Sequence, residues 1–400
     1  MLSEHLENNI GNRKSLQIEY NPVDCGDDEI LIGIPNSLSE KLRLYLTKSI
    51  FSCFVLVLIL ALGWKIESQY RRSIEKPTLR YRKEEDDSWV FKVLQITDIH
   101  LGEAEDLPWG PENDLKTLVA LDAIISKESP DLIVLSGDQL TANNCLKNAT
   151  SYYQLLGDFL IQYETPWAII FGNHDDMDFE IPGTNNTIPH KYSRRQLLEV
   201  DKSYQLSLSQ GGPLNVTGTT NYVLDIHIQG NNIATQIFFL DSGGGSLREA
   251  IDDSQIQWIR EVVSTSEVPA IAFQHIWPSI EHFKHCQGYQ GEGIAPLEYD
   301  AGIMQTLAES GRFSFIAVGH NHGNDYCCQY LETELKACFG RHSGYGGYGR
   351  WDRGSRIYEL RIPPTIKNTL PSLKWRTWVR LESGEIIDEI IQNNLNNSQS

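Results

Sequence analysis

Five short apolar runs in this chain each end in residues that commonly bind metal ions. The endings are Asp98-Ile-His100, Gly137-Asp138, Gly172-Asn-His-Asp175, Gln274-His275 and Gly319-His-Asn-His322. Helical patterns separate the runs, and this alternation is typical of an α/β layered domain. Because the carboxyl ends of the strands in such sheets face one crevice, we expect the five endings to converge there.

The expected strands and helices fill one folded region, residues 88–385. Expected strands lie at 89–97, 131–136, 167–172, 222–228, 235–240, 270–273, 313–318, 355–361 and 374–379, and expected helices lie near 111–127, 152–163 and 254–263. A chain of 400 residues with 40% hydrophobic content can bury a sizeable core. The sequence shows no internal repeat, so we predict a single α/β domain here.

Seven side chains in these endings are candidate metal ligands. Any one of them alone would be ordinary, because Asp, Asn and His often occupy caps and turns. Together they offer carboxylate, amide and imidazole groups, which suit iron, manganese or zinc. The seven are Asp98, His100, Asp138, Asn173, His275, His320 and His322. Neighbouring glycines let the backbone approach closely, so we expect a site for two metal ions.

The order of the motifs, D-x-H, G-D, G-N-H-D, H and G-H-x-H, resembles the calcineurin-like metallophosphoesterase superfamily. Residues 91–100, 239–244, 319–327 and 344–350 further resemble its purple acid phosphatase-like subgroup. That subgroup includes short-chain plant isoforms and the yeast dosage suppressor phosphatase. The resemblance spans roughly residues 88–385 and implies a layered αββα sandwich with a dinuclear metal centre.

The resemblance also assigns a role to each candidate. It implies that Asp98, His100 and His322 hold the first metal, that Asn173, His275 and His320 hold the second, and that Asp138 bridges the two. His174 takes the position of the catalytic imidazole, with Asp175 orienting it. Two such cations about 3.5 to 4 Å apart place a hydroxide for attack on phosphorus. His174 then protonates the departing alkoxide.

Three positions depart from the patterns of these relatives. Thr141 stands where purple enzymes carry the tyrosine that gives their colour, so we expect a colourless protein. Trp277 follows His275 where the subgroup has H-I-P, and Asn321 separates His320 from His322 where it has G-H-D-H. None of these changes removes a ligand, and the metals remain iron, manganese or zinc.

A glycine-rich loop follows the last motif and is expected to border the cleft. It carries Arg341, His342, Tyr345, Tyr348 and Arg350. Guanidinium groups match phosphate oxygens well, so Arg350 is a candidate substrate clamp. A solvated loop arginine is an equally good interpretation.

The function expected from these residues is hydrolysis of phosphate monoesters, on a small molecule or a protein. One alternative keeps the site and takes a phosphodiester. Another is a membrane-tethered binding protein with an inactive site. Nucleic acid is disfavoured as a partner, because 53 acidic against 34 basic residues give a net charge of −19.

The amino-terminal region is expected to attach this domain to a membrane. Residues 1–48 are polar and lack periodicity, which indicates a disordered tail. Residues 49–64 are uncharged, lack a polar face and lie between Lys48 and Lys65, so we expect a transmembrane signal anchor rather than a core helix or a cleaved signal peptide. A charged stalk is expected at 65–87 and a polar tail at 386–400.

Two features bear on the compartment of the domain. Basic residues follow the apolar run more densely than they precede it, and this favours a cytosolic domain. Glycosylation sequons at Asn148, Asn185 and Asn215 and the subgroup resemblance favour a lumenal or extracellular domain, which is the orientation we expect.

Two interpretations of the later cysteines stay open. Cys327 or Cys328 could form a disulfide with Cys338, or these residues could be buried free thiols.

Overall fold

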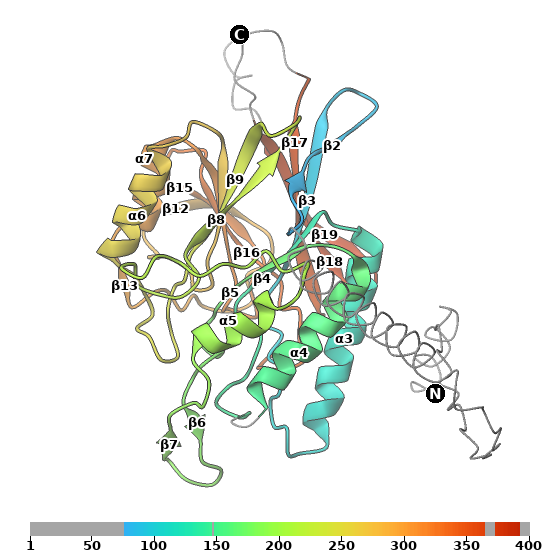
Figure 1. Ribbon diagram of the computed structural model, residues 1–400, viewed down its shortest axis with the longest axis vertical. Helices are drawn as coiled ribbons and strands as arrows, with labels where there is room; N and C mark the ends of the chain where they lie inside the picture. The colour runs from blue at the N-terminus through green and yellow to red at the C-terminus, as the bar shows by residue number, and fades with distance from the viewer. Residues whose placement is uncertain (1–75, 146–147, 365–372, 393–400) are drawn as a thin grey trace, which may run out of the picture. The chain divides into compact units, whose positions relative to one another are not determined.

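The computed structural model describes residues 76–145, 148–364 and 373–392. Two sheets form the centre of the domain (Figure 1). The first has eight strands in the order β1 (Leu79–Arg80), β8 (Tyr222–His227), β9 (Ile233–Phe239), β11 (Ala270–Phe273), β14 (Phe313–Val318), β16 (Lys336–Phe339), β15 (Cys327–Tyr330) and β12 (Phe283–Gln287). The expectation of an α/β fold is confirmed.

The second sheet has seven strands. Their order is β19 (Ile386–Ile391), β18 (Lys374–Leu381), β17 (Gly354–Ile362), β3 (Trp89–Ile96), β4 (Leu132–Ser136) and β5 (Trp167–Ile170), and β2 (Arg82–Lys83) also pairs with β3. Strands β3, β4 and β5 run parallel, whereas β17 pairs antiparallel with β3. Two small ladders join β6 (Phe179–Glu180) to β7 (Thr187–Ile188) and β10 (Ala250–Ile251) to β13 (Tyr299–Asp300).

Helices cover the outer face of each sheet (Figure 1). On the second sheet these are α3 (Trp109–Glu128), α4 (Ala149–Leu160) with the 3-10 turn η1 (Ile161–Tyr163), and α5 (Arg194–Lys202). On the first sheet they are α6 (Asp253–Val263) and α7 (Ile303–Ser310). One hydrophobic core lies under each group of helices, and a third fills the space between the two sheets. The layers therefore follow the expected αββα order.

Strand β3 shows why this layering suits the sequence. Successive side chains of a strand point to opposite faces. Phe91 and Val93 pack between the sheets, whereas Leu94 and Ile96 pack under the helices. A strand that is buried on both faces must be apolar nearly throughout. The sequence has nearly continuous apolar runs of this kind at β3, β4 and β5.

The folded domain is larger than 88–385 at both ends. Residues 79–83, expected to belong to a stalk, contribute β1 and β2, and Leu79 and Tyr81 are buried. Residues 386–391, expected to begin a polar tail, form β19 and pair with β18. Both expectations were wrong because these short segments pair with neighbouring strands, which bury Leu79 at one end of the domain and Ile390 at the other.

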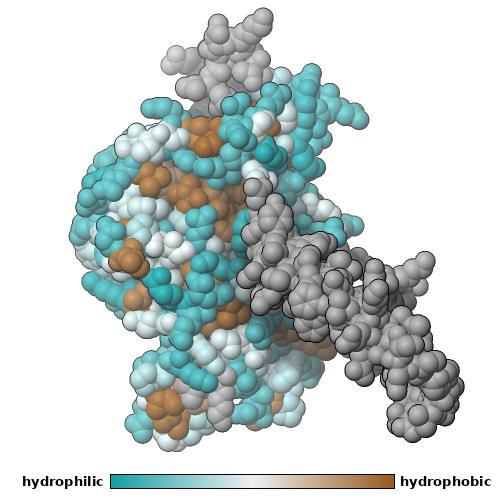
Figure 2. All heavy atoms as spheres, in the orientation of Figure 1, coloured by the Kyte–Doolittle hydropathy of each residue, from teal (hydrophilic) through white to brown (hydrophobic). Residues whose placement is uncertain are grey.

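The expected membrane anchor and tail cannot be placed on this fold. Residues 1–48 and the apolar run 49–64 lie outside the described residues. Within the part of the chain that the structure describes, no helix combines the length and apolar content that crossing a bilayer requires. Figure 2 shows hydrophilic side chains over much of one face of the domain, with smaller apolar patches between them.

Two disulfides fasten three neighbouring strands of the first sheet. Cys327 of β15 pairs with Cys338 of β16, which is one of the pairings expected from the sequence. Cys328 pairs instead with Cys286 of β12, a partner that the sequence analysis did not anticipate. Adjacent residues of a strand point to opposite faces, so Cys327 and Cys328 reach different partners. Cys145 is free and buried.

Candidate metal centre

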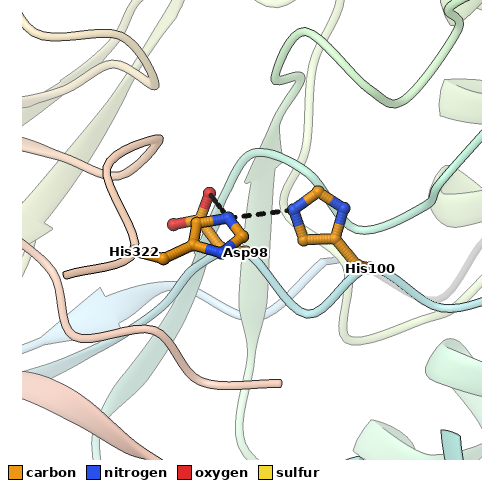
Figure 3. Close-up of side chains that lie close together, drawn as sticks. All are labelled: Asp98, His100 and His322. Atoms are coloured by element: carbon orange, nitrogen blue, oxygen red, sulfur yellow. Dashed lines mark hydrogen bonds and ion pairs between the residues drawn. The ribbon is translucent and has the colours of Figure 1, made fainter. Parts of the chain in front are cut away.

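Two groups of ligand-type side chains meet at the carboxyl ends of the central strands. The ligand atoms of Asp98, His100 and His322 all lie within 4.8 Å of one another, and so do those of Asp138, His275 and His320. Figure 3 shows the first group, in which the imidazoles of His100 and His322 face each other beside the Asp98 carboxylate. The convergence of segments after β3, β4, β11 and β14 follows the crevice rule for α/β sheets.

Asp138 lies where the two groups approach each other. Its Oδ2 is 3.6 Å from His100 Nε2 in the first group and 3.2 Å from His275 Nε2 in the second. The Asn173 side chain joins the second group, since its Oδ1 is 2.8 Å from His320 Nδ1 and 3.2 Å from His275 Nε2. The structure therefore brings together all seven candidate ligands.

Backbone conformation helps to aim these side chains. Asp98, His100, Asp138 and His320 all adopt positive φ, between 48° and 73°. Such values cost residues other than glycine on the order of 1–3 kcal/mol each and occur preferentially at functional sites. Four of the seven candidate ligands therefore have conformations that the surrounding fold must enforce.

Two glycines leave room for ligands that lie directly against the backbone. A Cβ on Gly137 would lie 2.2 Å from His275 Nδ1, and a Cβ on Gly172 would lie 2.2 Å from Asp138 Oδ1. Either side chain would displace a candidate ligand. These close approaches explain why glycine precedes Asp138 and Asn173.

Groups behind the histidines fix which nitrogen faces the centre. His275 Nδ1 lies 2.9 Å from the Ser136 carbonyl, His322 Nδ1 lies 2.9 Å from the Tyr348 carbonyl, and His100 Nδ1 lies 3.1 Å from Thr141 Oγ1. Each contact leaves Nε2 directed at the centre. Thr141, which replaces the tyrosine of purple enzymes, thus contacts the far side of His100.

The surroundings of His174 differ from the expectation. Asp175 does not orient this ring: its carboxylate accepts hydrogen bonds from the backbone N–H groups of Asp138, Leu140 and Gly172. It therefore ties the loop after β4 to the loop after β5. The partner of His174 Nδ1 is Asn143 Oδ1, at 3.3 Å. Asn143, the first residue of an Asn-Asn pair five residues after Asp138, gave no sequence signal for this contact.

The glycine-rich loop borders the centre through residues other than the expected arginine. The Tyr348 ring stacks on His322 with 4.0 Å between centroids, and the centroid of the buried His342 ring also lies 4.0 Å from that of His322. Arg341 forms an ion pair with Asp325 at 2.8 Å. Arg350 is exposed, and among the described residues no hydrogen bond or ion pair involves it. Its role as a clamp stays a prediction.

The charge balance of the centre fits bound cations. Burial holds the pKa of His100 well below its usual value and lowers that of His320 to about 3, so both are in the neutral form that binds metals. His275 behaves differently. Burial alone would lower its pKa, but the carboxylates of Asp138 and Asp98 raise it to about 9. The two buried carboxylates thus favour a positive charge beside them.

The geometry of the first group fits an ion as well. His100 Nε2 and His322 Nε2 lie 3.2 Å apart, and only one of them can donate a proton in that contact. Two imidazole nitrogens bound to one ion at about 2.1 Å lie about 3.0 to 3.4 Å apart, depending on the coordination geometry. The donor set and the spacing are those of a metal site.

Known proteins with similar sequences share this region. A sequence profile described as calcineurin-like phosphoesterase matches residues 91–324, more than half of the chain. "Probable inactive purple acid phosphatase 28" of Arabidopsis thaliana is 28% identical over 356 residues, which cover 78% of this chain and 84% of the relative. "Phosphatase DCR2" of Saccharomyces cerevisiae is 28% identical over 351 residues, covering 77% of this chain and 57% of the relative.

Among solved structures, a dimetal phosphatase from Danio rerio aligns over 75% of this chain and 98% of its own, with 12% identity and a TM-score of 0.47. The profile match, rather than this likeness, decides the assignment, because it covers the motifs from Asp98 to His322. The chain belongs to the calcineurin-like phosphoesterase family.

Proposed function

We propose that this chain is a dinuclear-metal phosphoesterase that hydrolyses phosphate monoesters, on small molecules or phosphoproteins. One observation carries the proposal: two largely buried ligand groups meet at Asp138, and every candidate ligand is present. Asp98, His100 and His322 would hold one ion, and Asn173, His275 and His320 the other, with Asp138 between them. Iron, manganese and zinc all suit these ligands.

Bound ions in this family supply positive charge to the phosphoryl oxygens and lower the pKa of a water molecule. The protein's own part is to position the ester and to move a proton. His174 is half-buried beside the first ligand group, with its ring 5.0 Å from that of His100. Asn143 engages Nδ1, which leaves Nε2 to donate a proton to the departing oxygen.

The test combines metal analysis with turnover. The full-length wild type should contain about two metal ions per chain and hydrolyse p-nitrophenyl phosphate. Asp138→Asn should lose metal and reduce kcat/KM by about a hundredfold or more, because one carboxylate serves both groups. A folded wild type that stays inert after iron, manganese or zinc is added would refute the proposal.

Two other functions share these residues. A phosphodiesterase would use the same centre, and hydrolysis of bis-p-nitrophenyl phosphate faster than of the monoester would favour it. A binding protein with an inactive site is supported by a specific observation, since the Arabidopsis thaliana relatives carry "probable inactive" in their names. Metal binding without turnover of either ester would favour that function.

We further propose that the domain lies in the lumen of the secretory pathway or outside the cell, attached through residues 49–64. Two disulfides support an oxidising compartment. The three sequon asparagines are all exposed, which supports glycosylation there. A phosphorylated small molecule or protein is the proposed partner, and the net charge of −19 argues against nucleic acid.

A further inference from the structure

Residues 288–296, which we call the strap, run alongside the segment that carries His320 and His322. Gly291 N donates to the Gly323 carbonyl at 2.8 Å, and Asp325 N donates to the Tyr289 carbonyl at 3.0 Å. Between these bonds, Gln290 pairs with Asn324. The strap thus follows the chain immediately after the two histidines.

Asn321 lies between the two histidines, and both the oxygen and the nitrogen of its side-chain amide form hydrogen bonds with the strap. Its Oδ1 accepts from Ala295 N at 3.2 Å, and its Nδ2 donates to the Gly293 carbonyl at 3.3 Å. The side chain is 5% exposed, so water cannot readily replace these partners. A carboxylate would offer only acceptors, whereas this position uses a donor and an acceptor.

Glu292 makes a second connection from the strap. Its carboxylate accepts from Gly323 N at 2.7 Å and from the Tyr348 hydroxyl at 2.9 Å. Tyr348 stacks on His322, and its carbonyl contacts Nδ1 of that ring. The strap therefore holds both the backbone after His322 and the aromatic ring packed against it.

A disulfide fastens the start of the strap. Cys286 lies two residues before it and pairs with Cys328, which follows the histidine segment in β15. This disulfide is reachable from its Cys286 end, which is exposed while Cys328 is 2% exposed, whereas Cys327 and Cys338 of the other disulfide are 1% and 0% exposed. Exposed disulfides are the ones that reductants reach first.

We propose that the strap positions His320 and His322 for metal binding, with Asn321 as the main positioning residue. In this proposal the strap keeps its position only while the Cys286–Cys328 disulfide is oxidised. The inference rests on the proposed metal centre. A dithiol reduces this disulfide by transferring two electrons to it, which breaks the S–S bond and leaves two protein thiols. The dithiol is itself oxidised to a disulfide. The freed strap then holds the two histidines less firmly, and metal leaves faster.

The first experiment measures metal loss from the metal-loaded, full-length chain in EDTA, by elemental analysis of desalted samples over time. Asn321→Ala should lose metal at least about tenfold faster than wild type, as for other groups that orient ligands. Asn321→Asp keeps the acceptor for Ala295 N and should be intermediate. Asn231→Ala, at an exposed position, is the matched control and should behave as wild type.

The second experiment needs no substitution. Treatment of the wild type with a phosphine reductant, which avoids thiol chelation of metal, should open Cys286–Cys328 first and accelerate metal loss. The double variant Cys286→Ala/Cys328→Ala should lose metal at that faster rate with or without reductant. Mass spectrometry of alkylated peptides identifies the disulfide that opens.

Several outcomes overturn the inference. Wild-type rates of metal loss in Asn321→Ala refute the positioning role, and unchanged loss after Cys286–Cys328 opens refutes the dependence on oxidation. Neither readout requires turnover. Strap-dependent metal retention without ester hydrolysis would therefore refute the proposed activity and leave this inference intact, whereas a wild type that binds no metal would refute both.

Discussion

At the scale of single residues, two further contacts hold the asparagine that faces His174. Asn143 Oδ1 faces its Nδ1, and the Asn143 amide nitrogen in turn donates to Glu180 Oε1 at 3.2 Å. The Glu180 backbone N–H donates to the Asn143 carbonyl at 2.9 Å. The asparagine that orients the ring is thus held from two sides by the residue that ends β6.

We expect His174→Ala to lower kcat by about 10² to 10⁴ for an alkyl phosphate and much less for p-nitrophenyl phosphate. A poor leaving group needs the proton that His174 supplies, whereas nitrophenolate leaves without it. Asn143→Ala should show the same dependence on the leaving group with a smaller loss. Equal losses for both esters, measured by steady-state kinetics, would contradict proton donation by His174.

Asp114 gives a residue-scale prediction for stability. Burial raises its pKa to about 6, and its Oδ1 accepts from Gly102 N at 3.1 Å. Because an unfolded aspartate has a pKa near 3.9, the folded chain loses stability as the pH rises from about 4 to about 6. An asparagine at this position cannot ionise and still offers the acceptor. Asp114→Asn should therefore raise Tm at pH 7.5 relative to wild type.

The same comparison at pH 4 is the internal control, because ionisation of Asp114 no longer costs the folded chain stability there. The gain in Tm should shrink or vanish. A gain of equal size at both pH values would mean that ionisation of Asp114 is not its cause.

At the scale of elements, α5 is attached to the site by one buried arginine. Arg194 pairs with Asp176 at 3.0 Å and with Asp241 at 2.5 Å, and its side chain is 2% exposed. It also donates to the carbonyls of Gly172, which directly precedes Asn173, and of Gly244, which lies against Asn173. The start of this helix thus ties together the loops after β5 and β9.

Removal of this cation leaves two buried carboxylates without their partner. Arg194→Met should lower the free energy of unfolding by about 3–5 kcal/mol, as other broken buried ion pairs do. The exposed neighbour Arg195 offers the matched control, and Arg195→Met should change stability by less than about 0.5 kcal/mol. Urea unfolding of both variants measures the difference, and similar losses would contradict a special role for Arg194.

At the scale of the whole molecule, the sequons test the proposed compartment. Asn185 and Asn215 are exposed, whereas Asn148 donates its side-chain amide to Glu105 Oε2 at 2.9 Å. A glycan on Asn148 would compete with that hydrogen bond, so we expect glycans at Asn185 and Asn215 first. Expression of the full-length chain in eukaryotic cells, followed by endoglycosidase treatment, should lower its apparent mass.

The double variant Asn185→Gln/Asn215→Gln should abolish most of that change in mass. A chain whose mass does not respond to the glycosidase would contradict a lumenal or extracellular domain and favour the cytosolic orientation. The same preparation tests the disulfides, since non-reducing peptide maps show whether Cys286 is bonded to Cys328 in cells.

The sequence by itself determined the ligand types, their order and the strands that carry them. These features are local: a strand buried on both faces must be apolar throughout, and metal chemistry requires particular side chains directly after it. Strands β3, β4, β11 and β14 were therefore predictable, as was the family. Helices α5 and α7 were missed because they span only nine and eight residues. Strands β12, β15 and β16 were missed because polar residues interrupt them, whereas the equally short β11 is wholly apolar.

Tertiary structure alone decided which remote residues support the site. Asn143 behind His174, Asp175 between two loops and Asn321 on the strap all pair across irregular segments, and Cys286 meets Cys328 across two strands that are remote in sequence. Loops carry no periodic pattern, so nothing in their sequence reports which backbone groups they will meet. Those partners are set by the packing of the two sheets, which brings together segments that are far apart in the chain.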